Sequence, residues 1–121
     1  MKFTINSDEW IIKLVSKNTI LEKYKTEFEE TPYCFGLTLY PIHEIWLNKE
    51  MCEEQLIKTL KHELTHCYIW EFGFSQLPNF TEEIVCDLVM SSNDFINNII
   101  SKFRKERRNT EMPVRKVKGR I

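Results

Sequence analysis

Apolar residues recur with the spacing of a helix in three long segments of the chain. The first begins at Asn6-Ser7-Asp8-Glu9, whose polar residues are typical of a helix start, and predicts a helix over about residues 8–29. Shorter stretches rich in β-branched and aromatic residues predict three strands: Met1–Ile5, Tyr33–Tyr40 and His43–Asn48. The last two are expected to pair antiparallel, and Gly36 indicates a bulge or a close approach of another element.

The second helical segment begins between Glu50 and Gln55 and runs to about Phe72, where Gly73 is expected to end the helix. Its apolar stripe predicts a buried face, made of Leu56, Ile57, Leu60, Leu64 and Cys67. The two histidines of this segment, His62 and His66, lie on a different face. The third segment starts at Thr81 and reaches about Phe103, and a polar stretch at residues 91–94 could divide it into two helices.

This pattern predicts an α+β fold with a small antiparallel sheet of about three strands, packed by an N-terminal helix and two further helices. The chain of 121 residues is long enough for one domain, which we place at residues 1–103. Residues 104–121 are expected to form a flexible basic tail, because Pro113 and Gly119 disfavour regular structure. The charge is divided in nearly the same way. Residues 1–101 carry 8 basic and 16 acidic side chains, whereas residues 102–121 carry 9 basic and 2 acidic side chains.

The composition predicts that the protein is cytoplasmic. No apolar run approaches the roughly 20 residues of a membrane-spanning helix. The N-terminus meets polar residues almost at once, so we do not expect a signal peptide. The four cysteines have no paired spacing and are expected to be reduced thiols in a cytoplasmic protein: Cys34, Cys52, Cys67 and Cys86.

The candidate chemistry lies in the second helix, in the sequence His62-Glu63-Leu64-Thr65-His66. Residues four apart on a helix share a face, so both imidazoles can bind one Zn²⁺ without distortion of the backbone. Glu63 would then be close to a zinc-bound water without being a ligand, which is the position of a general base. We therefore predict one Zn²⁺ ion bound by His62 and His66.

A catalytic zinc needs a third protein ligand and one open position. The downstream candidates are Glu82 and Glu83, and we choose Glu83 because Asp87 follows one turn later on the same face. A carboxylate at Asp87 can accept a hydrogen bond from the outer nitrogen of a ligand histidine and so orient it. A cysteine ligand of the kind found in peptide deformylases is disfavoured, because neither Cys34 nor Cys52 belongs to a Gly-Cys-Leu segment.

The pattern His62-Glu63-x-x-His66 followed by Glu83-x-x-x-Asp87 resembles the gluzincin arrangement of zincin metallopeptidases. The small size and the order of elements over about residues 33–90 resemble the ImmA/IrrE family. This resemblance implies a minimal zincin-like fold and a zinc-dependent metallopeptidase that hydrolyses a peptide bond in a protein substrate. That family includes phage and mobile-element proteins, some of which act on transcriptional repressors, so the resemblance also implies a regulatory protease.

In the implied mechanism Glu63 takes a proton from the zinc-bound water and returns it to the leaving amine. The candidate donors to the oxyanion are Tyr40, His43 and Tyr68. An extended substrate could pair with the strand Ile45–Asn48, where Trp46 would either line a subsite or pack in the core.

Two other functions fit the same residues. In the first, the zinc site is not catalytic and the basic residues 102–120 bind nucleic acid or an acidic protein partner. In the second, a zinc hydrolase acts on an amide that is not a peptide bond. A solvated tail without a partner is the simpler interpretation of the basic residues, since no aromatic residue follows Phe103.

Overall fold

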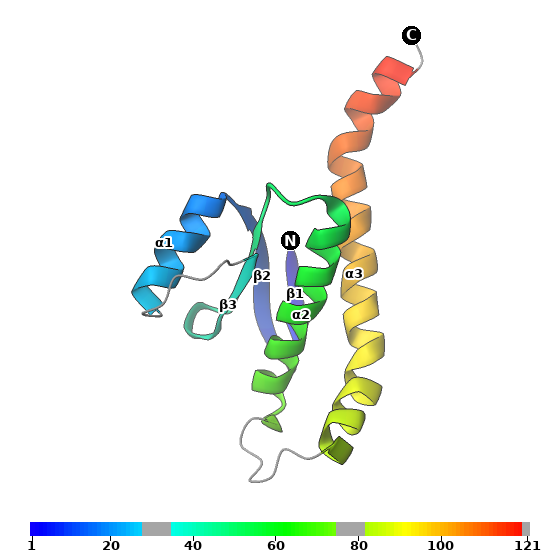
Figure 1. Cartoon of the computed structure of the whole chain (residues 1–121). Coiled ribbons are helices and arrows are strands. Elements are labelled where there is room, and N and C mark those ends of the chain that lie inside the picture. Colours follow the sequence, from blue (N-terminus) through cyan, green and yellow to red (C-terminus); the bar gives the residue numbers. More distant parts are fainter. Residues whose placement is uncertain (28–34, 75–81, 120–121) are drawn as a thin grey trace.

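The computed structural model describes residues 1–27, 35–74 and 82–119, without the side chains of residues 24–27, 82–83, 86–87, 90 and 110–119. A four-stranded sheet carries one helix on one face and two helices on the other (Figure 1), which confirms the α+β class. The elements follow the order β1 (Lys2–Ile5), β2 (Asp8–Val15), α1 (Lys17–Glu27), β3 (Gly36–Leu39), the short 3₁₀ helix η1 (Tyr40–Ile42), β4 (Glu44–Asn48), α2 (Glu53–Glu71) and α3 (Glu82–Gly119).

The sheet is mixed, with the strand order β1-β2-β4-β3. The predicted antiparallel pairing of the last two strands is confirmed, because β3 pairs antiparallel with β4. The prediction of about three antiparallel strands is incomplete, since β2 is a fourth strand and runs parallel to β4. β4 therefore has a neighbour on each side, and its predicted role as a strand that pairs with substrate is wrong. The described edge strands are β1 and β3.

The helix predicted over residues 8–29 is wrong in its first half, where the chain forms β2. Asn6 and Ser7 have φ angles of 49° and 69°, and they form a two-residue turn that sets Ile5 opposite Asp8. A run that is apolar on both sides fits the spacing of either a helix or a strand. Here the backbone pairs with β1 and β4, and Trp10 is buried on the face covered by α2 and α3.

The apolar stripe predicted for α2 is confirmed, since its five members are between 0% and 5% exposed. They pack against the sheet and against α3 in the main core. The end of the helix is also confirmed: α2 stops at Glu71, and Gly73 has a φ of 72°, which favours glycine. The opposite face of the sheet has a smaller core, in which Ile20 of α1 contacts Leu37 and Leu39.

α3 is one continuous helix of 38 residues, so the division predicted at residues 91–94 is wrong. The hydroxyls of Ser91 and Ser92 donate to the carbonyl oxygen of Leu88 at 3.3 and 2.6 Å, so they bond within the helix and cap no new one. The helix passes Phe103 and continues to Gly119, where irregular structure was predicted, and its C-terminal part projects beyond the sheet (Figure 1). Among the described helices, none combines the length and the apolar character needed to cross a membrane.

Gly36 confirms the predicted close approach. A Cβ atom there would lie 2.9 Å from Cγ2 of Thr59 and 3.0 Å from the carbonyl oxygen of Trp46, which cannot move without disturbing the sheet. We expect Gly36→Ala to lower the free energy of unfolding in urea by about 1–3 kcal/mol. Gly73→Ala is the control, because its Cβ would meet nothing within 4 Å and its cost would come from the positive φ alone. An unchanged stability of Gly36→Ala would contradict the packing of β3 on α2.

Candidate metal centre

The two histidines of α2 converge on the outside of the helix. The Nε2 atoms of His62 and His66 are 3.1 Å apart, and their rings lie edge to face with centroids separated by 4.7 Å. Both residues are exposed, and the His62 side chain is 69% accessible. The sequence predicted only that the two histidines lie on a different face of the helix from the apolar stripe. The 3.6-residue period of the helix is sufficient to bring these two side chains together.

The spacing of the two nitrogens suits a metal ion. Zinc binds histidine nitrogens at about 2.05 Å, so two such ligands of a tetrahedral ion are roughly 3.3 Å apart. The observed 3.1 Å is close to this value, and both rings could bind one ion with little change of rotamer. A hydrogen bond between two imidazoles has a similar length, so metal content is the measurement that decides between these alternatives.

Glu63 lies beside the histidine pair but points inward, and it is 7% exposed. Thr38 of β3 donates a hydrogen bond from its hydroxyl to Oε1 of Glu63 at 2.8 Å. The other carboxylate oxygen, Oε2, is 4.0 Å from Nε2 of His62. Glu63 is therefore oriented by β3 through Oε1, while Oε2 faces His62, which is the arrangement that the predicted general base would need.

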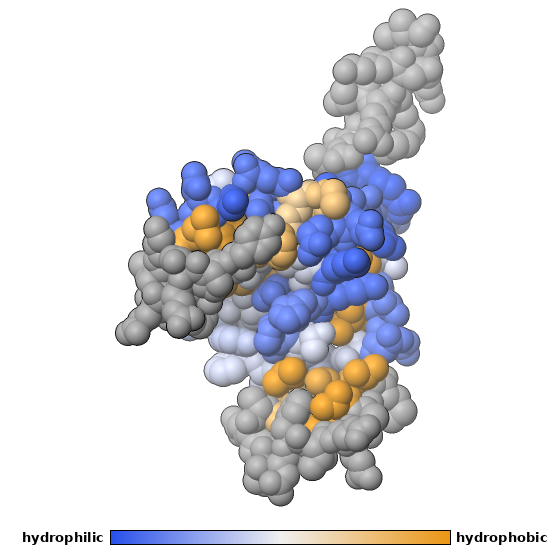
Figure 2. Space-filling view, viewed as in Figure 1, coloured by the Kyte–Doolittle hydropathy of each residue, from blue (hydrophilic) through white to orange (hydrophobic). Residues whose placement is uncertain are grey.

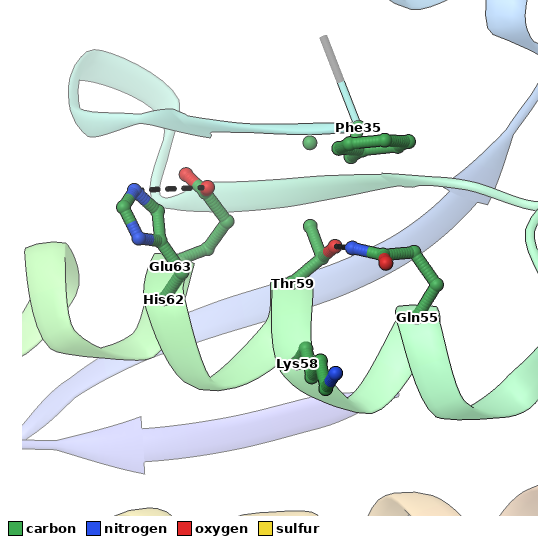
Figure 3. A pocket seen from close by; sticks show the side chains of 7 residues that line it. Phe35, Gln55, Lys58, Thr59, His62 and Glu63 are labelled. Carbon is green, nitrogen blue, oxygen red and sulfur yellow. Dashed lines mark hydrogen bonds and ion pairs between the residues drawn. The ribbon is translucent and has the colours of Figure 1, made fainter.

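A cleft of about 370 Å³ opens between α2 and the start of β3, with His62 and Glu63 in its wall (Figure 3). The remaining lining residues are Phe35, Gly36, Gln55, Lys58 and Thr59. Figure 3 shows Glu63 reaching from α2 toward β3 and His62 beside it at the end of the cleft. The cleft thus leads along the edge strand to the predicted catalytic groups.

Of the three candidate oxyanion donors, the structure places Tyr40 near Glu63. Burial raises the pKa of the Tyr40 hydroxyl, and the negative charge of Glu63 raises it further, so this hydroxyl is a protonated donor at neutral pH. Tyr68 instead packs among the rings of Phe72, Phe74 and Phe95. His43 lies against Trp10, with ring centroids 4.7 Å apart and planes at 3°.

The predicted third ligand, Glu83, lies in the first turn of α3, and Asp87 lies one turn later. The side chains of both residues are outside the described part of the structure, so their roles stay predictions. In the described region, α3 lines a pocket with Lys61 and Thr65 of α2 through residues from Leu88 to Asn97. Among the described side chains, no third histidine, cysteine or carboxylate joins His62 and His66 at ligand spacing.

The described cysteines give no support to a thiolate ligand. Cys67 is fully buried in the main core, and burial, followed by the charge of Glu71, raises the pKa of its thiol well above the usual range. Cys52 is an exposed free thiol before α2. Cys34 and the side chain of Cys86 lie outside the described residues.

Sequence reasoning missed a second group of potential ligands. Asp8, His43 and Glu71 each offer one atom, and these atoms all lie within 4.8 Å of one another. Burial raises the pKa of Glu71, and the neighbouring Asp8 raises it further, although a hydrogen bond from Trp10 opposes this. The three residues are far apart in the chain and belong to no motif, and the pairing of β2 with β4 that brings Asp8 and His43 together was not predicted.

The surface around these sites is unevenly polar. In the face drawn in Figure 2, hydrophilic side chains cover the middle of the molecule, and apolar ones gather at the end where α2 stops and α3 starts. The exposed large apolar residues of these two helix ends are Trp70, Phe72, Val85 and Val89.

The fold and the site together define a small α+β domain with a His-Glu-x-x-His helix packed beneath an edge strand. No protein-family model, curated protein or solved structure matches the chain.

Proposed function

We propose that the protein is a zinc-dependent metallopeptidase that hydrolyses a peptide bond in a protein substrate. One observation carries the proposal: the Nε2 atoms of His62 and His66 converge to 3.1 Å beside the buried carboxylate of Glu63. A structural pair of surface histidines does not require a carboxylate held in place beneath it. A regulatory role in a phage or mobile element, as the ImmA/IrrE resemblance implies, is part of the same proposal.

His62, His66 and the predicted ligand Glu83 would hold the zinc ion, which lowers the pKa of water and polarises a carbonyl group when bound. Glu63 takes a proton from the attacking water and delivers it to the leaving nitrogen. Thr38 keeps the Glu63 carboxylate beside His62 through its hydrogen bond to Oε1. Tyr40, whose hydroxyl stays protonated, is the best-placed donor to the oxyanion.

The edge strand β3 is the proposed binding surface for the substrate. It forms one side of the cleft, and Thr38 connects it directly to Glu63. Within the described residues β3 pairs with β4 alone, so its other edge can add an extended peptide through backbone hydrogen bonds. Trp46 of β4 is not a subsite residue in this arrangement, since it packs with Leu37 and Leu39 on the opposite face of the sheet.

Zinc content tests the ligand set. We expect Glu83→Ala to reduce the affinity for Zn²⁺ by at least tenfold, because it removes one of three protein ligands. Elemental analysis after dialysis against a zinc buffer would measure the loss. Glu82→Ala is the matched control, since it removes a neighbouring acid from the same helix start. Equal zinc retention in both variants, combined with loss in His66→Ala, would mean that the third ligand is another residue.

A non-catalytic module that binds nucleic acid or a protein partner is the second proposal. The observation in its favour is the projecting end of α3, where four basic side chains are exposed: Lys102, Arg104, Lys105 and Arg108. Arg107 differs from them, because its guanidinium lies over the ring of Phe103 at 5.8 Å from the centroid. A variant that keeps zinc but lacks the general base would lose the peptidase function and keep this one.

A further inference from the structure

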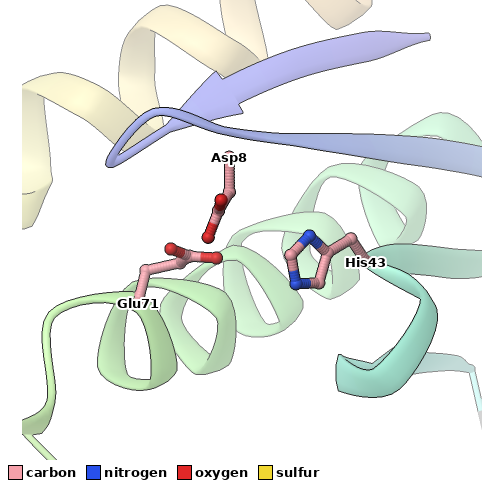
Figure 4. A group of neighbouring side chains, drawn as sticks. All are labelled: Asp8, His43 and Glu71. Atoms are coloured by element: carbon pink, nitrogen blue, oxygen red, sulfur yellow. The ribbon is translucent and has the colours of Figure 1, made fainter.

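A second group of metal-ligand side chains lies where three elements meet. Asp8 is the first residue of β2, His43 stands between η1 and β4, and Glu71 is the last residue of α2. One carboxylate oxygen from each acid and one ring nitrogen of His43 lie within 4.8 Å of one another. Figure 4 shows the two carboxylates and the imidazole turned toward a common space. Glu71 is five residues beyond His66, about 7.5 Å further along the helix axis, so this group is separate from the histidine pair.

The buried Trp10 holds two members of the group in place. Its ring stacks on His43 with planes at 3°, which sets the plane of the imidazole. Its indole N–H donates to Oε2 of Glu71 at 2.8 Å, which orients that carboxylate. Trp10 is itself 0% exposed, so the packing of the core around it fixes the position of its ring. Metal ligands in proteins are commonly oriented in this way by neighbouring hydrogen bonds and packing.

The turn between β1 and β2 is tied to the same place. Asn6 donates from its side-chain amide to the carbonyl oxygen of Glu71 at 3.0 Å, and Asp8 follows two residues later. The amide N–H of Ile11 donates to the carbonyl oxygen of His43 at 3.0 Å. These hydrogen bonds fix the backbone positions of Asp8, His43 and Glu71 relative to one another.

The arrangement places negative charge where a cation is favoured. Two carboxylates converge at the C-terminal end of α2, which is the negative end of the helix dipole. In the described ranges, the lysine ion pairs are made with Glu9, Glu44 and Glu54 and not with Asp8 or Glu71. A positive charge between the two acids would relieve their repulsion.

We propose that Asp8, His43 and Glu71 bind a divalent cation. One imidazole nitrogen and two carboxylate oxygens form a donor set suited to Zn²⁺ and similar first-row metal ions. The ion would connect the β1–β2 hairpin, the start of β4 and the end of α2, and so stabilise this end of the sheet. The proposal does not depend on the peptidase function.

Zinc binding by isothermal titration calorimetry, with protein first stripped by a chelator, tests the proposal. The double variant His62→Ala/His66→Ala removes the first site and changes only exposed side chains, so we expect it to bind one equivalent of Zn²⁺. Asp8→Asn, made in the wild-type chain and in the double variant, is expected to weaken this binding at least tenfold. Glu9→Gln is the matched control, since it removes the same charge from the next residue, which pairs with Lys2 instead.

The outcomes separate the two sites. If the wild-type chain binds two zinc ions and Asp8→Asn loses one, both sites exist. If the wild-type chain binds one ion that Asp8→Asn loses and the double variant keeps, this site exists and the first does not. The proposal is overturned if Asp8→Asn and Glu9→Gln bind zinc alike in the wild-type chain. It is also overturned if the double variant, shown to be folded by circular dichroism, binds no zinc.

Discussion

Replacing Glu63 with Gln is expected to lower the rate of peptide cleavage by about 10²–10⁴-fold, the range typical of a lost general base, while zinc content stays unchanged. Glutamine has nearly the same shape as glutamate, and its side-chain oxygen can still accept the hydrogen bond that Thr38 donates to Oε1. The amide cannot take a proton from water at neutral pH. The loss should therefore fall on the chemical step and leave the fold and the histidine pair intact.

The assay uses a library of peptides derived from a proteome, incubated with zinc-loaded protein and searched for new termini by mass spectrometry. Glu54→Gln is the matched control, because Glu54 is an exposed acid on the same helix that pairs with Lys58 at 3.6 Å. It should cleave like the wild-type protein. Cleavage at the wild-type rate by zinc-loaded Glu63→Gln would rule out the proposed mechanism. Absence of cleavage by the wild-type protein, with intact binding to a partner, would favour the non-catalytic module.

Trp10→Ala is expected to lower the free energy of unfolding by about 3–5 kcal/mol, which is the cost of deleting a large aromatic side chain from a core. Trp10 is 0% exposed and packs near the rings of Phe3, Tyr40 and His43. Its indole is also the hydrogen-bond donor to Glu71. Trp10 thus joins the sheet, the η1 turn and the end of α2, so truncation should loosen all three.

Two further variants separate the contributions of the aromatic ring and of the hydrogen bond to the stability lost in Trp10→Ala. Trp10→Phe keeps an aromatic ring but removes the donor to Glu71, and we expect a smaller loss of about 1–3 kcal/mol. Trp70→Ala removes the same kind of side chain from a position that is 52% exposed, where the ring lies tilted against that of Tyr40. The resulting loss of stability should not exceed about 1.5 kcal/mol. Unfolding in urea measures the free energy of unfolding of all three variants. A loss for Trp10→Ala no larger than that for Trp70→Ala would contradict the position of β2 in the core.

Several features of the fold could be predicted because they depend on residues close in the sequence. The five apolar residues of α2 and the shared face of His62 and His66 follow from the period of one helix. The end of α2 just before Gly73 and the antiparallel pair of β3 and β4 likewise follow from local signals. The same local geometry places Glu63 next to the histidines, so the centre of the candidate site was visible in the sequence.

Other features were decided by contacts between distant segments. Residues 8–15 are apolar on both sides and fit a helix or a strand, and only pairing with β1 and β4 makes them a strand. The parallel register that sets Ile11 opposite Glu44 brings His43 beside Trp10. It thereby creates the group of Asp8, His43 and Glu71, which no local pattern contains. Periodicity reports which face of an element is apolar, but the choice of neighbouring strand is made by packing and backbone hydrogen bonds across the whole domain.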